Sequence, residues 1–326
     1  RRYDALPTEL PFDKDINVEE TGEELLTPHK HKLKELLKND KLPADDRILI
    51  EGALERYEDW IRVMSGIKSD GDEKVFELVA ALNEYKMFIE LEVIWDSKND
   101  FLYRQKGQIK LDNSIIEEFL PWLVHPSIIP ALDGKVYVAG PRKAFSGAYF
   151  STTLTSPAAG AGLQIRAKDQ DFTVSRPAYL QASWDASFPK YDTVTHEIYL
   201  AFVAAECKTN LDKTMFQEAA ATAHDVRTAV PGARYYLLCE WLDMSPISTA
   251  GTDIEEVIIL RGKRLGSNQR QGFSKFDVRQ KEREKYKVYL EENPIRPERI
   301  LRFVNHLRAI FNDTEIKETD VLERGY

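Results

Sequence analysis

The sequence is poor in cysteine and has no long apolar run. Two cysteines, Cys207 and Cys239, occur among its 326 residues. They are too few for a disulfide framework and fit a reducing compartment, and no Cys/His cluster has zinc-ligand spacing. No apolar run approaches the roughly 18 residues of a membrane-spanning helix, and the polar residues 1–30 do not resemble a signal peptide. We therefore expect a cytoplasmic protein that does not enter a membrane.

The sequence also lacks the usual nucleotide-binding and hydrolase motifs. Neither a Walker A motif nor G-x-G-x-x-G occurs, which argues against a phosphate loop of either kind. There is no G-x-S-x-G element either, so an α/β-hydrolase nucleophile is not expected. The chemistry has to come from other polar side chains.

Positive charge is scarce overall but concentrated in one segment. The chain has 45 Lys and Arg against 54 Asp and Glu, a net charge of −9. Residues 261–287 hold ten Lys and Arg and three acids, a local net charge of +7. The cations are Arg261, Lys263, Arg264, Arg270, Lys275, Arg279, Lys281, Arg283, Lys285 and Lys287. Such a basic strip can follow a phosphate backbone, or it can be a solvated charged helix.

The pair Glu206 and Lys208 ends an apolar run that begins at Ile198. Alternate side chains of a strand share a face, so the two charges point the same way and Cys207 points the other way. Charges at the end of a core strand need partners or a metal. The Glu-x-Lys pattern therefore suggests a metal-dependent nuclease, and its alternative is an ordinary ion pair at a solvated strand end.

A second apolar stretch, 172–182, precedes the first, and Asp171 comes directly before it. A turn near Phe188-Pro189 predicts an antiparallel hairpin in which Asp171 lies opposite Glu206. Two converging carboxylates suit Mg²⁺, with Lys208 positioning water or stabilising the phosphorane-like transition state. Pro177 predicts an edge or a bulge. Asp169 is either an additional ligand or a solvated acid; the rival acids, Asp192 and Glu197, lie toward the closed end of this hairpin.

A helix is predicted directly after the Glu-x-Lys strand. Asn210 or Asp212 caps it, and it ends near Thr228, before Pro231-Gly232. Residues 234–241 then form a second buried strand, so strand, helix and strand make a crossover between parallel neighbours. Gln217 lies on this helix and is a candidate to touch a phosphate or water; its alternative is a surface amide. His224 is interpreted as an ordinary helix histidine.

Candidate DNA contacts lie in two further places. Residues 134–166 combine glycine, aromatic residues and the basic pair Arg142-Lys143, as in loops that enter a DNA groove, although an ordinary strand and turn fits equally. The basic strip adds four candidates, Lys263, Arg264, Arg270 and Lys275.

The arrangement resembles the PD-(D/E)XK nuclease superfamily. Residues 168–172 (KDQDF), 205–225 (AECKTNLDKTMFQEAAATAHD) and 235–249 (YYLLCEWLDMSPIST) further resemble type II restriction endonucleases of the Bpu type, which cut the site CCTNAGC with two different subunits. The resemblance covers residues 160–262. It implies a prokaryotic enzyme, Mg²⁺-dependent cutting of double-stranded DNA, 5′-phosphate and 3′-hydroxyl ends, metal ligands Asp171 and Glu206, and a catalytic Lys208. The superfamily's usual proline before the aspartate is Gln170 here.

The expected fold is α/β, with a mixed central sheet flanked by helices and with helical extensions at both ends. We predict a mainly helical region at 1–130, a nuclease core at 131–262 and a basic helical region at 263–326. Helical patterns cover 19–39, 44–66, 73–96, 114–124, 281–291 and 298–311.

Three functions remain open at this stage. The first is a restriction endonuclease that cuts a specific short site, paired with itself or with a second subunit. The alternatives are a non-catalytic, DNA-binding subunit of a nuclease pair, and a repair or junction-resolving nuclease of the same fold.

Overall fold

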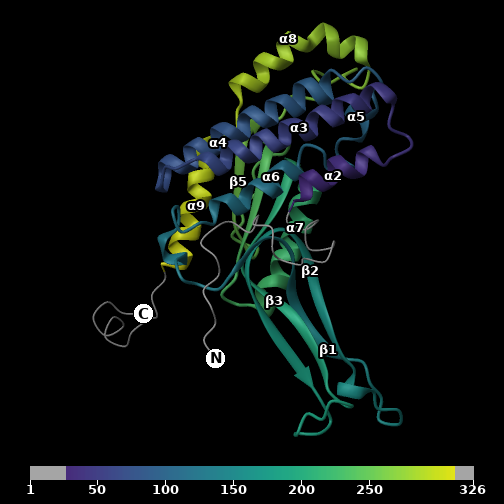
Figure 1. Ribbon diagram of the computed structural model, residues 1–326, viewed down its shortest axis with the longest axis vertical. Helices are drawn as coiled ribbons and strands as arrows, with labels where there is room; N and C mark the ends of the chain where they lie inside the picture. The colour runs from purple at the N-terminus through teal and green to yellow at the C-terminus, as the bar shows by residue number, and fades with distance from the viewer. Residues whose placement is uncertain (1–26, 313–326) are drawn as a thin grey trace.

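The chain folds around one mixed five-stranded sheet with the strand order β1-β2-β3-β4-β5. It is seen here in a computed structural model that describes residues 27–312 (Figure 1). The strands are β1 (Val138–Phe150), β2 (Leu163–Ala182), β3 (Val194–Leu211), β4 (Arg234–Leu242) and β5 (Ile254–Lys263). The first three strands pair antiparallel, and β3, β4 and β5 pair parallel.

Helices cover both faces of the sheet. They are α2 (Pro28–Leu37), α3 (Ala44–Gly66), α4 (Gly71–Met87), α5 (Phe101–Gln105), α6 (Ser114–Phe119), α7 (Lys213–Ala229), α8 (Phe276–Glu292) and α9 (Pro297–Phe311). The shorter elements are a π-helix, η1 (Phe88–Trp95), and three 3₁₀ turns, η2 (Leu120–Leu123), η3 (Pro130–Leu132) and η4 (Ala159–Gly162). One face packs against α3, α4, α6 and α9, and the other packs against α7.

The alternation of side chains along β3 explains how one strand serves both faces. Ala205 and Cys207 belong to the large apolar cluster under α3, α4 and α9, whereas Ala204 belongs to the cluster under α7. Small side chains at these positions let helices approach both faces of the strand closely. Glu206 and Lys208 lie on the same face of β3 as Ala204, because side chains two residues apart in a strand share a face.

The predicted hairpin and crossover are both confirmed. β2 and β3 pair antiparallel, and α7 connects β3 to its parallel neighbour β4. Asp212 caps α7, accepting a hydrogen bond of 2.9 Å from the backbone N–H of Met215. Pro177 lies beyond Ser175, where the pairing of β1 with β2 ends, so its missing N–H faces an open edge.

The helix expected at 73–96 is confirmed, and its two parts differ in type. It begins as α4 and continues from Phe88 as the π-helix η1. Periodicity could not reveal the change, because a π-turn keeps the chain helical. The helix expected at 19–39 is described from Pro28, and the residues before 27 lie outside the described part.

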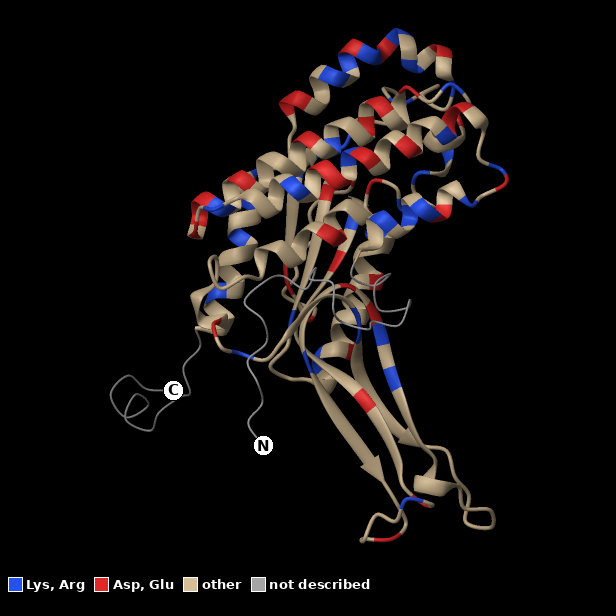
Figure 2. Ribbon diagram, viewed as in Figure 1, with Lys and Arg blue, Asp and Glu red and all other residues tan. Residues whose placement is uncertain are grey.

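The first three strands extend beyond the helices as a ribbon (Figure 1). Its far end is largely uncharged (Figure 2). Exposed large side chains gather on the ribbon and its loops: Tyr149, Phe150, Leu154, Tyr179, Trp184, Phe188, Tyr191 and Phe202. Asp171, midway along β2, meets the part of β3 that contains the Glu-x-Lys pair, near the end of that strand.

The apolar core is continuous across the three regions expected from the sequence. One cluster joins α3 and α4 to the sheet and to α9, and another joins η1, Trp241 and α8. None of the helices within residues 27–312 combines the length and apolarity needed to cross a membrane.

Candidate active site

The peptide of Cys207 organises the candidate active site. Its N–H donates to Asp171 Oδ2 at 2.9 Å, and its carbonyl accepts from Asn113 Nδ2 at 3.0 Å. Its thiol faces the core and is buried, which raises its pKa well above the usual value. The residue between the two charges of the motif therefore joins β3 to β2 and to the start of α6.

A β-bulge places Asp171 at this peptide. Gly140 pairs with Thr173 and Arg142 pairs with Gln170, so β2 uses three residues where β1 uses two. On its other side, the pairing of β2 with β3 begins at Phe172 and Ala205. Bulges redirect side chains, and the Asp171 carboxylate bonds to the N–H of Cys207, two residues beyond the last paired residue of β3, Ala205.

Glu206 and Lys208 form a close pair on the α7 face of β3. Lys208 Nζ lies 2.5 Å from Glu206 Oε1, and the Tyr235 hydroxyl donates to Glu206 Oε2 at 3.2 Å. Burial disfavours the Lys208 ammonium, but Glu206 and then Asp171 outweigh it and raise its pKa. Lys208 is therefore a cation at neutral pH, suited to binding a phosphate oxygen or orienting water rather than to acting as a base.

The structure adds a third carboxylate, Glu117 of α6, which the sequence interpretation missed. Lys110 Nζ contacts Asp171 Oδ1 at 3.0 Å and Glu117 Oε1 at 3.1 Å, and Asn113 Nδ2 donates to the same Glu117 oxygen at 3.1 Å. Burial, and then the charge of Asp171, raise the pKa of Glu117 to about 7. A signal was present, because Glu117 interrupts an apolar segment just as Glu206 does.

A cavity of about 480 Å³ opens beside these groups. Lys110 and Lys208 line it together with two residues of the basic strip, Arg264 and Arg270. Aromatic side chains, including Trp241, form another part of its wall. Two of the predicted DNA contacts thus share a cavity with the predicted catalytic lysine.

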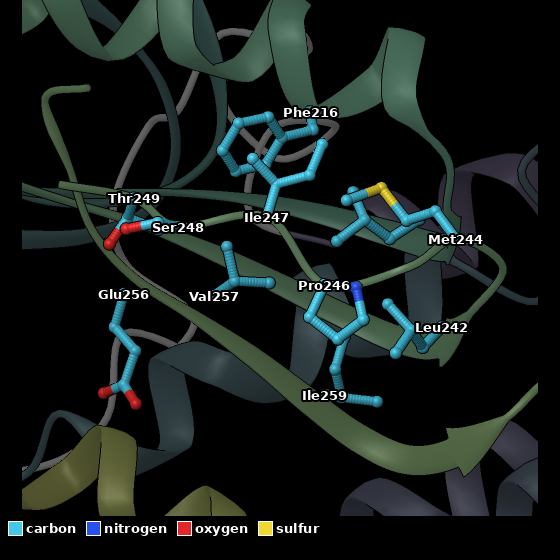
Figure 3. A pocket seen from close by; sticks show the side chains of 11 residues that line it. Phe216, Leu242, Met244, Pro246, Ile247, Ser248, Thr249, Glu256, Val257 and Ile259 are labelled. Atoms are coloured by element: carbon cyan, nitrogen blue, oxygen red, sulfur yellow. The ribbon is translucent and has the colours of Figure 1, made fainter. Parts of the chain in front are cut away.

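A second pocket, of about 390 Å³, lies away from this chemistry. Leu211, Phe216, Leu242 and their neighbours give it a mostly apolar wall (Figure 3). Its one carboxylate, Glu256, is bound by Arg302 and His306 at 2.6 Å each. Such a wall offers packing rather than catalysis.

Other predicted site residues are not brought together with Asp171. Gln217 is exposed on α7, and none of the hydrogen bonds found within residues 27–312 joins it to Asp171, Glu206 or Lys208. Asp169 is exposed on β2. The rivals lie along the ribbon: Glu197 pairs with Tyr179, and Asp192 accepts bonds from Ser183 and Trp184. His224 Nδ1 lies 2.7 Å from Asp253 Oδ2 on the surface of α7.

The remaining predicted DNA contacts are dispersed. Arg142 stacks on the Tyr199 ring at 4.8 Å, and the neighbouring Lys143 is exposed on β1. Lys263 is exposed at the end of β5, and Lys275 is exposed at the start of α8.

The idea of one continuous basic strip is corrected in part. Arg261 and Arg279 are buried, with 3% and 0% of their surface exposed. Arg261 bonds to Glu90 and Glu240, and Arg279 bonds to backbone carbonyls of residues 95 and 273. Along α8 the charges of both signs alternate (Figure 2). Buried guanidinium groups stabilise the fold and cannot reach a DNA backbone.

The carboxylates suit a divalent metal bound through few protein ligands. No group of three or more metal-ligating side chains occurs within residues 27–312. Mg²⁺ commonly uses only one or two carboxylates and completes its shell with water and substrate phosphate. Asp171 and Glu206 retain 16% and 21% side-chain exposure, and the Cys207 N–H and Tyr235 hydroxyl hold one oxygen of each. The donor set therefore fits such an ion.

Comparison with known proteins finds a matching family and similar solved structures. Residues 108–326, about two thirds of the chain, match the Bpu10I restriction endonuclease family. A solved structure, titled "native BbvCI A2B2 tetramer at low resolution", is similar with a TM-score of 0.60 and 22% sequence identity, covering 89% of this chain and 98% of that one. At this identity the likeness concerns the fold. No curated protein sequence matches the chain. The matched family segment includes Glu117, Asp171, Glu206 and Lys208.

Proposed function

Because the chain belongs to the Bpu10I restriction endonuclease family, we propose that it is a type II enzyme of the PD-(D/E)XK kind that cuts both strands of DNA at a specific short site. The reaction is hydrolysis of phosphodiesters, leaving 5′-phosphate and 3′-hydroxyl ends. One observation carries the proposal: the peptide of Cys207 binds Asp171 at the point where β3 presents Glu206 and Lys208.

The proposed cofactor is Mg²⁺, held by Asp171 and Glu206. When bound there, the ion polarises the scissile phosphate and lowers the pKa of a coordinated water. The protein keeps the two carboxylates oriented through the Cys207 N–H and the Tyr235 hydroxyl. Glu117 adds a further carboxyl group, which shares Lys110 with Asp171.

Lys208 is the proposed catalytic lysine. Its ammonium orients the attacking water or stabilises charge on the phosphorane-like transition state. Glu206 holds it at 2.5 Å, so its position is fixed before substrate arrives. Direct attack by water predicts inversion at phosphorus. Gln217 remains a predicted contact to phosphate or water.

Double-stranded DNA is the proposed substrate, and its backbone passes the cavity beside Lys208. Arg264 and Arg270 line this cavity, which supports their role in phosphate binding. Phosphate contacts set the register of a protein on DNA, whereas groove contacts read bases. We assign Arg142, Lys143, Lys263 and Lys275 to further contacts along the duplex.

We further propose that the chain works with a second subunit. The similar BbvCI structure is titled an A2B2 tetramer. The exposed aromatic and aliphatic side chains of the ribbon, such as Tyr191 at 84% and Leu154 at 100% exposure, support association, since large apolar patches mark interaction sites. Light scattering of the purified chain, alone and with DNA, tests whether it forms an assembly.

Replacing Lys208 tests the catalytic proposal. Lys208→Ala is expected to abolish Mg²⁺-dependent cutting of phage DNA and to retain binding in a mobility-shift assay with Ca²⁺. Lys213→Ala, an exposed position at the start of α7, is the control and should cut normally. Intact cutting by Lys208→Ala refutes the proposal.

The same assay separates the alternative functions. Discrete bands whose sequenced ends share a motif indicate site-specific cutting. Cutting restricted to branched or damaged DNA indicates a repair or junction-resolving enzyme. A protein that shifts DNA but leaves it intact with every divalent metal, alone and with its partner subunit, is a recognition subunit.

A further inference from the structure

Lys110 lies between two carboxylates of the candidate active site. Its Nζ is 3.0 Å from Asp171 Oδ1 and 3.1 Å from Glu117 Oε1. The other Asp171 oxygen already accepts from the Cys207 N–H. Lys110 therefore occupies the side of Asp171 that remains open to a ligand.

The carboxylates lie on regular structure and the lysine does not. Asp171 is on β2 and Glu117 is on α6, whereas Lys110 lies in a run of turns between α5 and α6. Its backbone has a φ of 50°, in the left-handed region that most side chains avoid. Its side chain keeps 45% exposure, against 7% for Glu117. The lysine is thus the member of this cluster that can move at least cost.

A divalent metal on Asp171 Oδ1 would compete directly with this ammonium. The two cations need the same oxygen, and at such separation like charges repel strongly. We propose that Lys110 is an internal counter-ion that competes with the metal for Asp171 and Glu117, and that it releases both carboxylates when the metal binds. This inference rests on the proposed metal-dependent function.

Lys110, once released from the carboxylates, can turn toward the cavity of about 480 Å³. Lys110 lines it together with Lys208, Arg264 and Arg270. A DNA phosphate bound among these cations offers Lys110 a new anionic partner. DNA binding thereby weakens the competitor and raises the affinity for metal, and by linkage the metal raises the affinity for DNA by the same factor. The chain alone binds metal weakly.

Metal titration without DNA tests the competition and does not depend on cutting. Mn²⁺ is titrated calorimetrically into the natural chain and into Lys110→Met, which keeps the aliphatic stem. Loss of one unit charge beside the ligand oxygens is expected to tighten Mn²⁺ binding by at least about tenfold. Lys110→Gln, checked with Lys110→Met by thermal melting, provides a second variant in case one of them folds poorly.

Lys106→Met is the matched control. Lys106 lines the same cavity, but its ammonium lies over the Tyr103 ring at 4.7 Å rather than on a carboxylate. Its replacement changes the local charge equally, so unchanged Mn²⁺ affinity in this variant shows that the effect belongs to the contacts of Lys110.

Two failures are distinguishable. If Asp171→Asn abolishes Mn²⁺ binding but Lys110→Met binds no tighter than the natural chain, or binds more weakly, Lys110 helps to assemble the site and the competition is wrong. If neither the natural chain nor Lys110→Met binds Mn²⁺, or Asp171→Asn leaves binding unchanged, the proposed metal site fails and the inference falls with it.

Discussion

A buried ion network predicts a large loss of stability when one lysine is replaced. Lys86 of α4 contacts Glu240 of β4 at 2.6 Å and Glu90 of η1 at 3.1 Å. Arg261 of β5 contacts Glu90 at 2.8 Å and Glu240 at 2.9 Å. The four side chains expose 9% of their surface or less. Two positive and two negative charges thus balance inside the fold.

Lys86→Met leaves Glu90 and Glu240 to share Arg261. Burial disfavours the Lys86 ammonium, yet Glu240 and Glu90 hold its pKa above the usual value, so a full charge is removed at neutral pH. Breaking a buried pair on one side typically costs about 3–5 kcal/mol. Lys86 Nζ also donates to the carbonyl of Asp112 at 3.0 Å, so the residues leading to Asn113 lose an anchor as well.

Urea unfolding measures this loss, with Lys68→Met, an exposed lysine before α4, as control. The double variant Lys86→Met/Glu240→Gln removes one charge of each sign. It should recover part of the loss, about 1–3 kcal/mol relative to the single variant. If Lys86→Met unfolds at the same urea concentration as the natural chain, or if the double variant is the less stable of the two, the reasoning from charge balance is refuted.

Two further predictions concern one acid and one helix cap. Burial raises the pKa of Glu118 to about 7 from 4.5. The contribution of Glu118 to stability is therefore complete below pH 4.5 and is lost as pH rises through 7. Over this range the free energy of unfolding should fall by up to about 3 kcal/mol. In urea titrations Glu118→Gln should flatten this part of the pH profile. Asp212→Ala removes the cap bond to the Met215 N–H and should cost about 1 kcal/mol, while Asp212→Asn should cost less in thermal melts; equal melting of Asp212→Ala and the natural chain contradicts this.

The half of the candidate site carried by β2 and β3 was predictable because these strands follow one another along the chain. An apolar run ending in Glu206 and Lys208 fixes which face each side chain takes, and one turn fixes the register with β2. The bulge at Asp171 was not predictable, since it depends on the pairing with β1. It redirects the carboxylate to the Cys207 N–H rather than simply opposing Glu206.

The part of the site contributed by 110–117 could not be placed from the sequence. These residues precede Asp171 by more than fifty positions, and nothing in their pattern indicates which strand they meet. The contact is made by Asn113, whose amide bonds to Glu117 and to the Cys207 carbonyl. Such a bridge follows from the docking of α6 on the sheet, which depends on the whole apolar cluster.

A charged residue inside an apolar run is expected to be buried. Its exposure in the structure then indicates whether it has a structural or a catalytic role. Glu240 sits in β4 among apolar and aromatic neighbours, as Glu206 sits in β3. Glu240 has 1% side-chain exposure and is matched by two cations, whereas Glu206 has 21% and faces one. A group that must meet a metal and a phosphate needs an open side, which Glu206 has and Glu240 lacks. In the sequence both acids lie within apolar strand segments. Only their three-dimensional surroundings distinguish Glu206, the candidate metal ligand, from Glu240, the structural ion.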